Sequence, residues 1–147
     1  MKSGNKIYSV AATLLLLVAM LCLGTVEAEA QEIMQINFKV KFINTARKKE
    51  FNAPVYYKLY SCKSTADEVK AEYEKIIAQS DYDNMVKFTE KHGISKRTIS
   101  GIFSGINAVP GMGMLVLSEE YGVAETFEIK EGVTDYPDVI FKVLIQE

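Results

Sequence analysis

The sequence is poor in the side chains that most often bind metals, form disulfides or act as bases near neutral pH. It contains one histidine, His92, and two cysteines, Cys22 and Cys62. A zinc site usually needs three or four protein ligands, and this supply of histidine and cysteine falls short of that number. We therefore expect no metal and no other cofactor.

The chain also lacks a strong excess of charge of either sign. Its formal net charge is −2, and this value does not change when residues 1–30 are left out. Such a balance provides no electrostatic reason to bind nucleic acid or an anionic membrane surface. We predict no nucleic-acid partner, and we expect the partner to be a protein or another component of a cell envelope.

The longest uncharged apolar stretch occupies residues 10–23, which is shorter than the ~20 residues needed to span a bilayer. Lys2 and Lys6 precede it, and Ala28 and Ala30 follow it with the small side chains that signal peptidase requires. Residues 1–30 are therefore predicted to be a secretory signal peptide that is cleaved before Gln31, with cleavage after Ala28 as the alternative. We expect an exported protein, periplasmic or secreted to the cell surface, with no transmembrane segment after cleavage.

Cysteine placement bears on lipidation and on disulfides. The residue before Cys22 is Leu21, where a lipoprotein signal carries a small residue, so we predict no lipid anchor. Cleavage would leave Cys62 as the one cysteine, and no internal disulfide could then form. We interpret Cys62 as a small buried side chain, with a bridge to another chain as the alternative.

Residues 31–147 are enough for a single domain with one core, and they begin with strand patterns. Residues 34–42 alternate apolar and polar side chains, which predicts a strand with one wet face. Residues 44–50 are polar and predict an exposed turn. Val55, Tyr57 and Leu59 predict one face of a second strand, with Pro54 at its start.

The periodicity then changes to that of helices. Residues 66–79 are predicted to form a helix capped by Ser64 or Thr65, because apolar residues recur at helical spacing after a capping signal. A second helix is predicted from Asp81, as its cap, to residue 91. Together they form a predicted helical insertion at about residues 65–92.

The rest of the chain predicts strands and turns. Residues 98–106 are β-rich but interrupted by glycines, and residues 112–117 are an apolar run that could be buried on both faces. Apolar and polar side chains alternate in residues 126–130 and 139–145. Together these elements predict a mainly β fold, an antiparallel β-sandwich with a one- or two-helix insertion after the second strand.

Residues 109–122 and 125–132 resemble the carboxypeptidase regulatory-like domains, which are transthyretin-like β-sandwiches common in exported proteins of Bacteroidetes-type bacteria. The resemblance covers about residues 34–61 and 99–145 and leaves the helical segment unmatched. It departs at Gly113, where the family has a tyrosine, and in the missing Asp-Gly turn. The resemblance implies a non-catalytic accessory, adhesion or docking module.

Candidate catalytic and ligand-binding residues all have simpler structural explanations. His92 could serve a hydrolase with Ser104, Ser118 or Cys62 as nucleophile, but its position predicts a helix end. A fragment of a calcium loop is suggested by Asp81, Asp83 and Asn84, but a helix cap explains them better. A phosphate loop is suggested by Gly101, Gly105, Gly111 and Gly113, but these glycines predict turns and bulges instead.

Tyr56 and Tyr60 are the candidate partner-binding residues, because both lie on the outward side of the second predicted strand. We favour the explanation that the helical insertion covers them, and partner binding is the alternative. We expect no catalytic residues and interpret the protein as an exported, non-catalytic binding or accessory module. The alternatives are a small secreted hydrolase and a structural subunit of an envelope assembly bound through an exposed strand edge.

Overall fold

The first strand organises one half of the fold. The structure is a computed structural model that describes residues 32–145. Strand β1 (Met34–Asn44) buries every second side chain, including Ile36, Phe38, Val40 and Phe42, as the alternation predicts. The predicted signal peptide, Cys22 and the cleavage before Gln31 lie outside the described residues.

Strand β1 lies at the centre of the first sheet. Strands β5 (Gly101–Ala108) and β2 (Lys49–Phe51) pair antiparallel with it, whereas β8 (Val139–Val143) pairs parallel with it. The exposed turn predicted for residues 44–50 is partly wrong, because residues 49 and 50 belong to β2. The aromatic ring of Phe51 anchors this strand, since its centroid lies 5.4 Å from that of Phe42.

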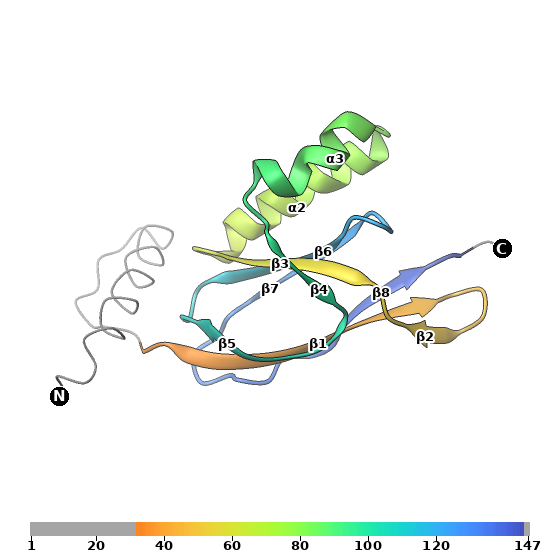
Figure 1. Cartoon of the computed structure of the whole chain (residues 1–147). Helices are drawn as coiled ribbons and strands as arrows, with labels where there is room; N and C mark the ends of the chain where they lie inside the picture. Colours follow the sequence, from red (N-terminus) through yellow and green to blue (C-terminus); the bar gives the residue numbers. More distant parts are fainter. Residues whose placement is uncertain (1–31, 146–147) are drawn as a thin grey trace.

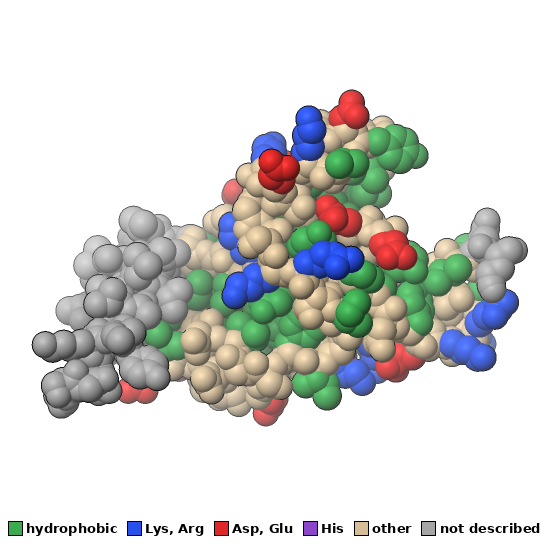
Figure 2. All heavy atoms as spheres, viewed as in Figure 1, with side chains coloured by type: hydrophobic (Ala, Val, Ile, Leu, Met, Phe, Trp, Pro, Cys, Tyr) green, Lys and Arg blue, Asp and Glu red, His purple; other side chains and the backbone are tan. Residues whose placement is uncertain are grey.

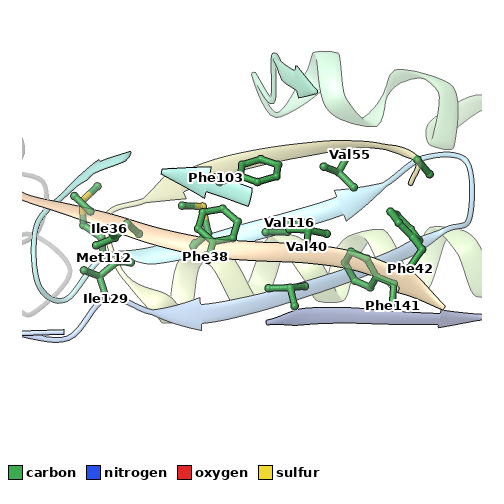
Figure 3. Packing of buried hydrophobic residues seen from close by; sticks show 14 of the residues in the cluster. Ile36, Phe38, Val40, Phe42, Val55, Phe103, Met112, Val116, Ile129 and Phe141 are labelled. Atoms are coloured by element: carbon green, nitrogen blue, oxygen red, sulfur yellow. The ribbon is translucent and has the colours of Figure 1, made fainter. Parts of the chain in front are cut away.

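The second sheet has the order β4 (Lys96–Ile99), β3 (Pro54–Tyr60), β6 (Gly113–Ser118) and β7 (Val123–Glu128), and all its pairs are antiparallel. Its inner face packs on the first sheet around apolar side chains from both (Figure 3). The predicted mainly β sandwich is confirmed. The β-rich segment predicted at residues 98–106 is divided between the sheets, because Gly101, with a φ of 140°, lets the chain cross from β4 to β5.

Two helices, α2 (Lys63–Ala78) and α3 (Tyr82–Lys91), lie on the outer face of the second sheet (Figure 1). Strand β6 is therefore sandwiched between the helices and the first sheet, and all its residues are buried, as its apolar sequence predicts. Asp81 caps α3 as predicted, with its carboxylate accepting the N–H of Asn84. The predicted cap of the first helix is wrong, because Cys62 holds that position without a side-chain cap.

Gly113 is needed for a close approach of backbones, which corrects its prediction as a turn or bulge residue. A Cβ at this position would lie 2.6 Å from the Cα of Lys63 and 2.8 Å from the carbonyl oxygen of Cys62. The start of α2 therefore occupies the space that a side chain would take. Gly105, in contrast, adopts a φ of 66° beside a register shift between β1 and β5, so the predicted bulge is confirmed there.

Candidate functional site

His92 fastens the two helices together. It ends α3, and its Nε2 lies 2.8 Å from Oε2 of Glu72 on α2, while Lys91 lies 3.2 Å from the same oxygen. The hydrogen bond with His92 is the main cause that lowers the pKa of Glu72. The His92 ring also packs against that of Phe88, with the centroids 4.4 Å apart and the planes tilted by 43°.

None of the nucleophiles considered with His92 contacts it in the described part of the chain. Ser104 is exposed on β5, and Ser118 is buried with its Oγ accepting the N–H of Tyr121. The buried thiol of Cys62 contacts the hydroxyls of Ser64 and Thr65. The structure therefore does not bring together the side chains of a hydrolytic triad around His92.

Tyr56 and Tyr60 both pack against the apolar cluster beneath the helices. The hydroxyl of Tyr60 is buried without a hydrogen-bond partner among the described residues, and burial raises its pKa to about 12. Tyr56 lies nearer the rim, beside Arg97 and Glu119, and burial also raises its pKa. Both side chains are half-buried, and their role in partner binding stays a prediction.

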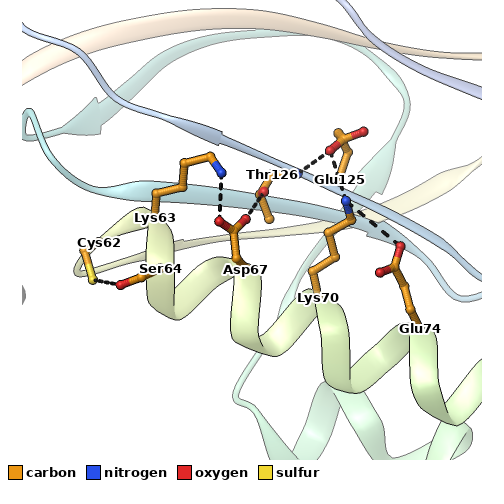
Figure 4. Close-up of polar contacts among 8 residues, drawn as sticks. All are labelled: Cys62, Lys63, Ser64, Asp67, Lys70, Glu74, Glu125 and Thr126. Atoms are coloured by element: carbon orange, nitrogen blue, oxygen red, sulfur yellow. Dashed lines mark hydrogen bonds and ion pairs between the residues drawn. The ribbon is translucent and has the colours of Figure 1, made fainter.

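A polar network explains how α2 is held on β7 (Figure 4). The carboxylate of Asp67 accepts hydrogen bonds from Lys63 at 2.7 Å and from the Thr126 hydroxyl at 2.5 Å, which lower its pKa. One turn further on, Lys70 lies 3.3 Å from Glu125. These charges satisfy one another, so the network serves to fix the helix.

Asp81, the first acidic residue after α2, serves the helix that follows it. Asp81 caps α3 and also accepts a hydrogen bond from the Asn84 amide at 2.6 Å. Within residues 32–145, no cluster of three or more His, Cys, Asp or Glu side chains has a geometry suited to a metal ion. The helices of the same region are too short or too polar to cross a membrane.

A concave feature lies between the edge of β5 and the part of β3 beyond its pairing with β4. We call it the edge cleft. Its volume is about 480 Å³. Hydrophobic atoms lie between these strands on the face shown in Figure 2, with basic side chains beside them. It is lined by Tyr57, Lys58, Leu59, Gly93, Ser95, Lys96, Gly105, Ile106 and Asn107.

The direction of the backbone groups in β1 follows from one residue. The N–H of Asn37 donates to Thr134, and its carbonyl accepts from Tyr136, both on the side of β1 away from β5. Successive residues of a strand direct their N–H and C=O to opposite edges. Ile36 therefore directs its backbone groups toward β5.

The same alternation continues across the pair. Ile106 lies opposite Ile36 and directs its backbone groups back to β1. Asn107, the next residue, must then direct its N–H and C=O away from β1 and into the edge cleft. Because β5 ends its sheet, no described strand pairs with this edge.

Strand β3 presents a second unpaired stretch to the cleft. Ala53 accepts the N–H of Ser100 on the β4 side, so Tyr57 and Leu59 direct their backbone groups to that side as well. The pairing of β4 with β3 stops at Tyr57, opposite Lys96. The backbone groups of Leu59 therefore face the cleft without a strand beside them in the described region.

Two lysines give the edge cleft a positive charge. The ammonium of Lys58 donates to the carbonyl of His92 at 2.8 Å and lies 4.9 Å from the centroid of the Tyr60 ring. The side chain of Lys96 is exposed. Neither lysine forms an ion pair within residues 32–145, and no acidic residue lines the cleft.

Sequence reasoning did not identify the edge cleft or its residues. One signal was present: residues 101–108 contain no charge and no proline, although natural edge strands usually carry such protection. The pattern alone does not reveal that this strand lies at an edge.

Comparison with protein-family models, with curated proteins and with solved structures finds no match to this chain.

Proposed function

We propose that this protein is an exported, non-catalytic module that binds an extended segment of another protein by adding it to the edge of β5. The observation that carries the proposal is the outward N–H and C=O of Asn107 at an edge where no described strand pairs. Addition of a strand satisfies such groups with main-chain hydrogen bonds, each with a net contribution of about 0.5–1.5 kcal/mol.

The other edges of the sandwich are better protected than β5. Exposed charges occur on β4 at Lys96 and Arg97, on β7 at Glu125 and Glu128, and on β8 at Lys142. Charged side chains on an edge discourage pairing with a second chain. Strand β5 carries none, and Ile102 on it is 78 % exposed, which offers apolar contact to an added strand.

A binding role also fits the chemistry of the cleft better than hydrolysis does. The polar side chains that line it belong to two lysines, a serine, an asparagine and a tyrosine, and the imidazole of His92 forms a hydrogen bond with Glu72. The proposed role agrees with what the resemblance to carboxypeptidase regulatory-like domains implies. Export remains part of the proposal and rests on residues 1–30.

The test removes one backbone donor. Asn107→Pro deletes the outward N–H and leaves the hydrogen bonds to β1 intact, because a proline is tolerated at an edge where the N–H faces away from the sheet. The matched control, Asn107→Ala, changes the side chain and keeps the N–H. Both variants are first checked for an unchanged circular dichroism spectrum and melting temperature.

The binding assay uses random twelve-residue peptides displayed on phage and selected against the purified protein. We expect selected peptides to bind wild type and Asn107→Ala equally and to lose at least tenfold in affinity for Asn107→Pro. Peptides with N-methyl groups at alternate residues should bind as weakly to wild type, which needs no protein variant. Selected peptides that bind Asn107→Pro and tolerate N-methylation would refute strand addition.

A further inference from the structure

Within that proposed function, we infer that the recognised segment carries an acidic side chain, and that Lys58 and Lys96 select it. This inference rests on the strand addition proposed above and specifies the chemistry of the partner. Its basis is the unneutralised positive charge of a cleft that already presents two backbone edges.

The lysines of the edge cleft differ from five other lysines of the described sandwich. Lys39, Lys41, Lys63, Lys70 and Lys91 all lie within 4.0 Å of a carboxylate. Lys58 has a carbonyl oxygen and an aromatic ring as its neighbours instead. An ammonium without a carboxylate in a concave site attracts an anionic ligand group and repels a cationic one.

The position of Lys58 is also held by the fold. Its hydrogen bond to the carbonyl of His92 keeps the ammonium at the end of α3, where the helix dipole favours a positive charge. The carbonyl accepts one of the three protons of the ammonium, so donors remain for a ligand oxygen. Lys58 is therefore oriented before a ligand arrives.

The apolar lining determines what accompanies the acidic side chain. Tyr57, Leu59 and Ile106 contribute to the sandwich core and also line the cleft. In an extended peptide successive side chains point to opposite faces. Lys96 lies opposite Tyr57 and shares its face of the second sheet, whereas Lys58 lies on the helix face. An acidic residue directed at Lys96 therefore leaves its two neighbours on the other side, and apolar residues two positions away share its face.

The alternative ligand is a small organic anion, which would use the lysines but not the backbone edges. An anion alone would leave the outward groups of Asn107 and Leu59 unpaired. We therefore assign the cleft to a peptide, and inorganic phosphate and acetate serve as competitors in the test.

The experiment uses the peptides selected on wild type. We expect aspartate or glutamate to be enriched at one position over its frequency in the unselected library. For the best such peptide, replacing this residue by its amide should weaken binding to wild type about two- to fivefold at low salt, which is the range for an exposed ion pair. The difference should shrink in 0.5 M salt, because salt screens exposed charges.

Matched protein variants locate the charge. Lys96→Glu should weaken the acidic peptide by a similar factor and leave its amide analogue unchanged. Lys142→Glu is the control, because Lys142 is exposed on β8 and forms no ion pair in the described structure. Equal binding of acidic and amide peptides, or an equal effect of Lys142→Glu, would overturn the inference.

The two proposals fail in different ways. If Asn107→Pro abolishes binding but charge has no effect, strand addition stands and acidic selection is wrong. If phosphate or acetate displaces the peptide at millimolar concentration and Asn107→Pro has no effect, the cleft is an anion site and both proposals are wrong. If the library yields no binding peptide, both are also wrong.

Discussion

Tyr73 offers the sharpest test of whether the helices form part of the folded unit. Its side chain is 1 % exposed, and its hydroxyl donates to the carbonyl of Ser118 on β6 at 2.9 Å. Its ring lies 4.9 Å from that of Phe88 on α3. Tyr73 thus connects both helices to the second sheet.

Two substitutions separate the hydroxyl from the ring. Tyr73→Phe removes a buried hydrogen bond and should cost about 1 kcal/mol of unfolding free energy. The cost stays small because the carbonyl of Ser118 still accepts the N–H of Gly122 at 3.0 Å. Tyr73→Ala also leaves a cavity, and the total cost should be about 3–5 kcal/mol. The control Tyr82→Ala, at a side chain 70 % exposed, should change the free energy of unfolding by less than about 0.5 kcal/mol.

The measurement is urea unfolding at pH 7, followed by circular dichroism. A Tyr73→Ala variant within 1 kcal/mol of wild type would refute the view that the helices belong to the cooperative unit. The pH dependence provides a second readout. Burial raises the pKa of Tyr73 from 10.0 to about 12, so its stabilising contribution is present below pH 10 and is lost as pH rises toward 12. Tyr73→Phe should therefore lose less stability than wild type between pH 10 and 12.

Two further predictions concern backbone packing and acid stability. Gly113→Ala should destabilise the protein by more than about 2 kcal/mol in the same urea assay, because its Cβ would meet the backbone of Lys63; a melting temperature within one degree of wild type would contradict this. Hydrogen bonds lower the pKa values of the Glu72 and Asp67 carboxyl groups below their ordinary 4.5 and 3.8. The stability that these carboxylates contribute is therefore present above their ordinary pKa values and is lost as pH falls through the lowered pKa values. Glu72→Gln should reduce the loss of unfolding free energy between pH 5 and 3. If the free energy of unfolding falls with pH as steeply as in wild type, the hydrogen bond between Glu72 and His92 contributes nothing to stability.

Local pattern was sufficient for most elements because each is specified by neighbouring residues. The alternation from Met34 onward and the helical spacing after Thr65 correctly predicted a strand and a helix. Asp81 was identifiable as a cap from its own position. Strand β2 was missed, because three residues of mainly polar sequence carry no strand signal and are held by the ring of Phe42.

What required the tertiary structure was the relation between distant segments. By itself the sequence determined a mainly β domain with two helices and an apolar strand buried on both faces, since burial periodicity is written residue by residue. Only the fold decided that β8 runs parallel to β1, that Gly113 must make room for α2, and that β5 lies at an edge facing the unpaired end of β3. Edges and clefts arise from which strands are neighbours, and strand order depends on contacts among residues far apart in the chain.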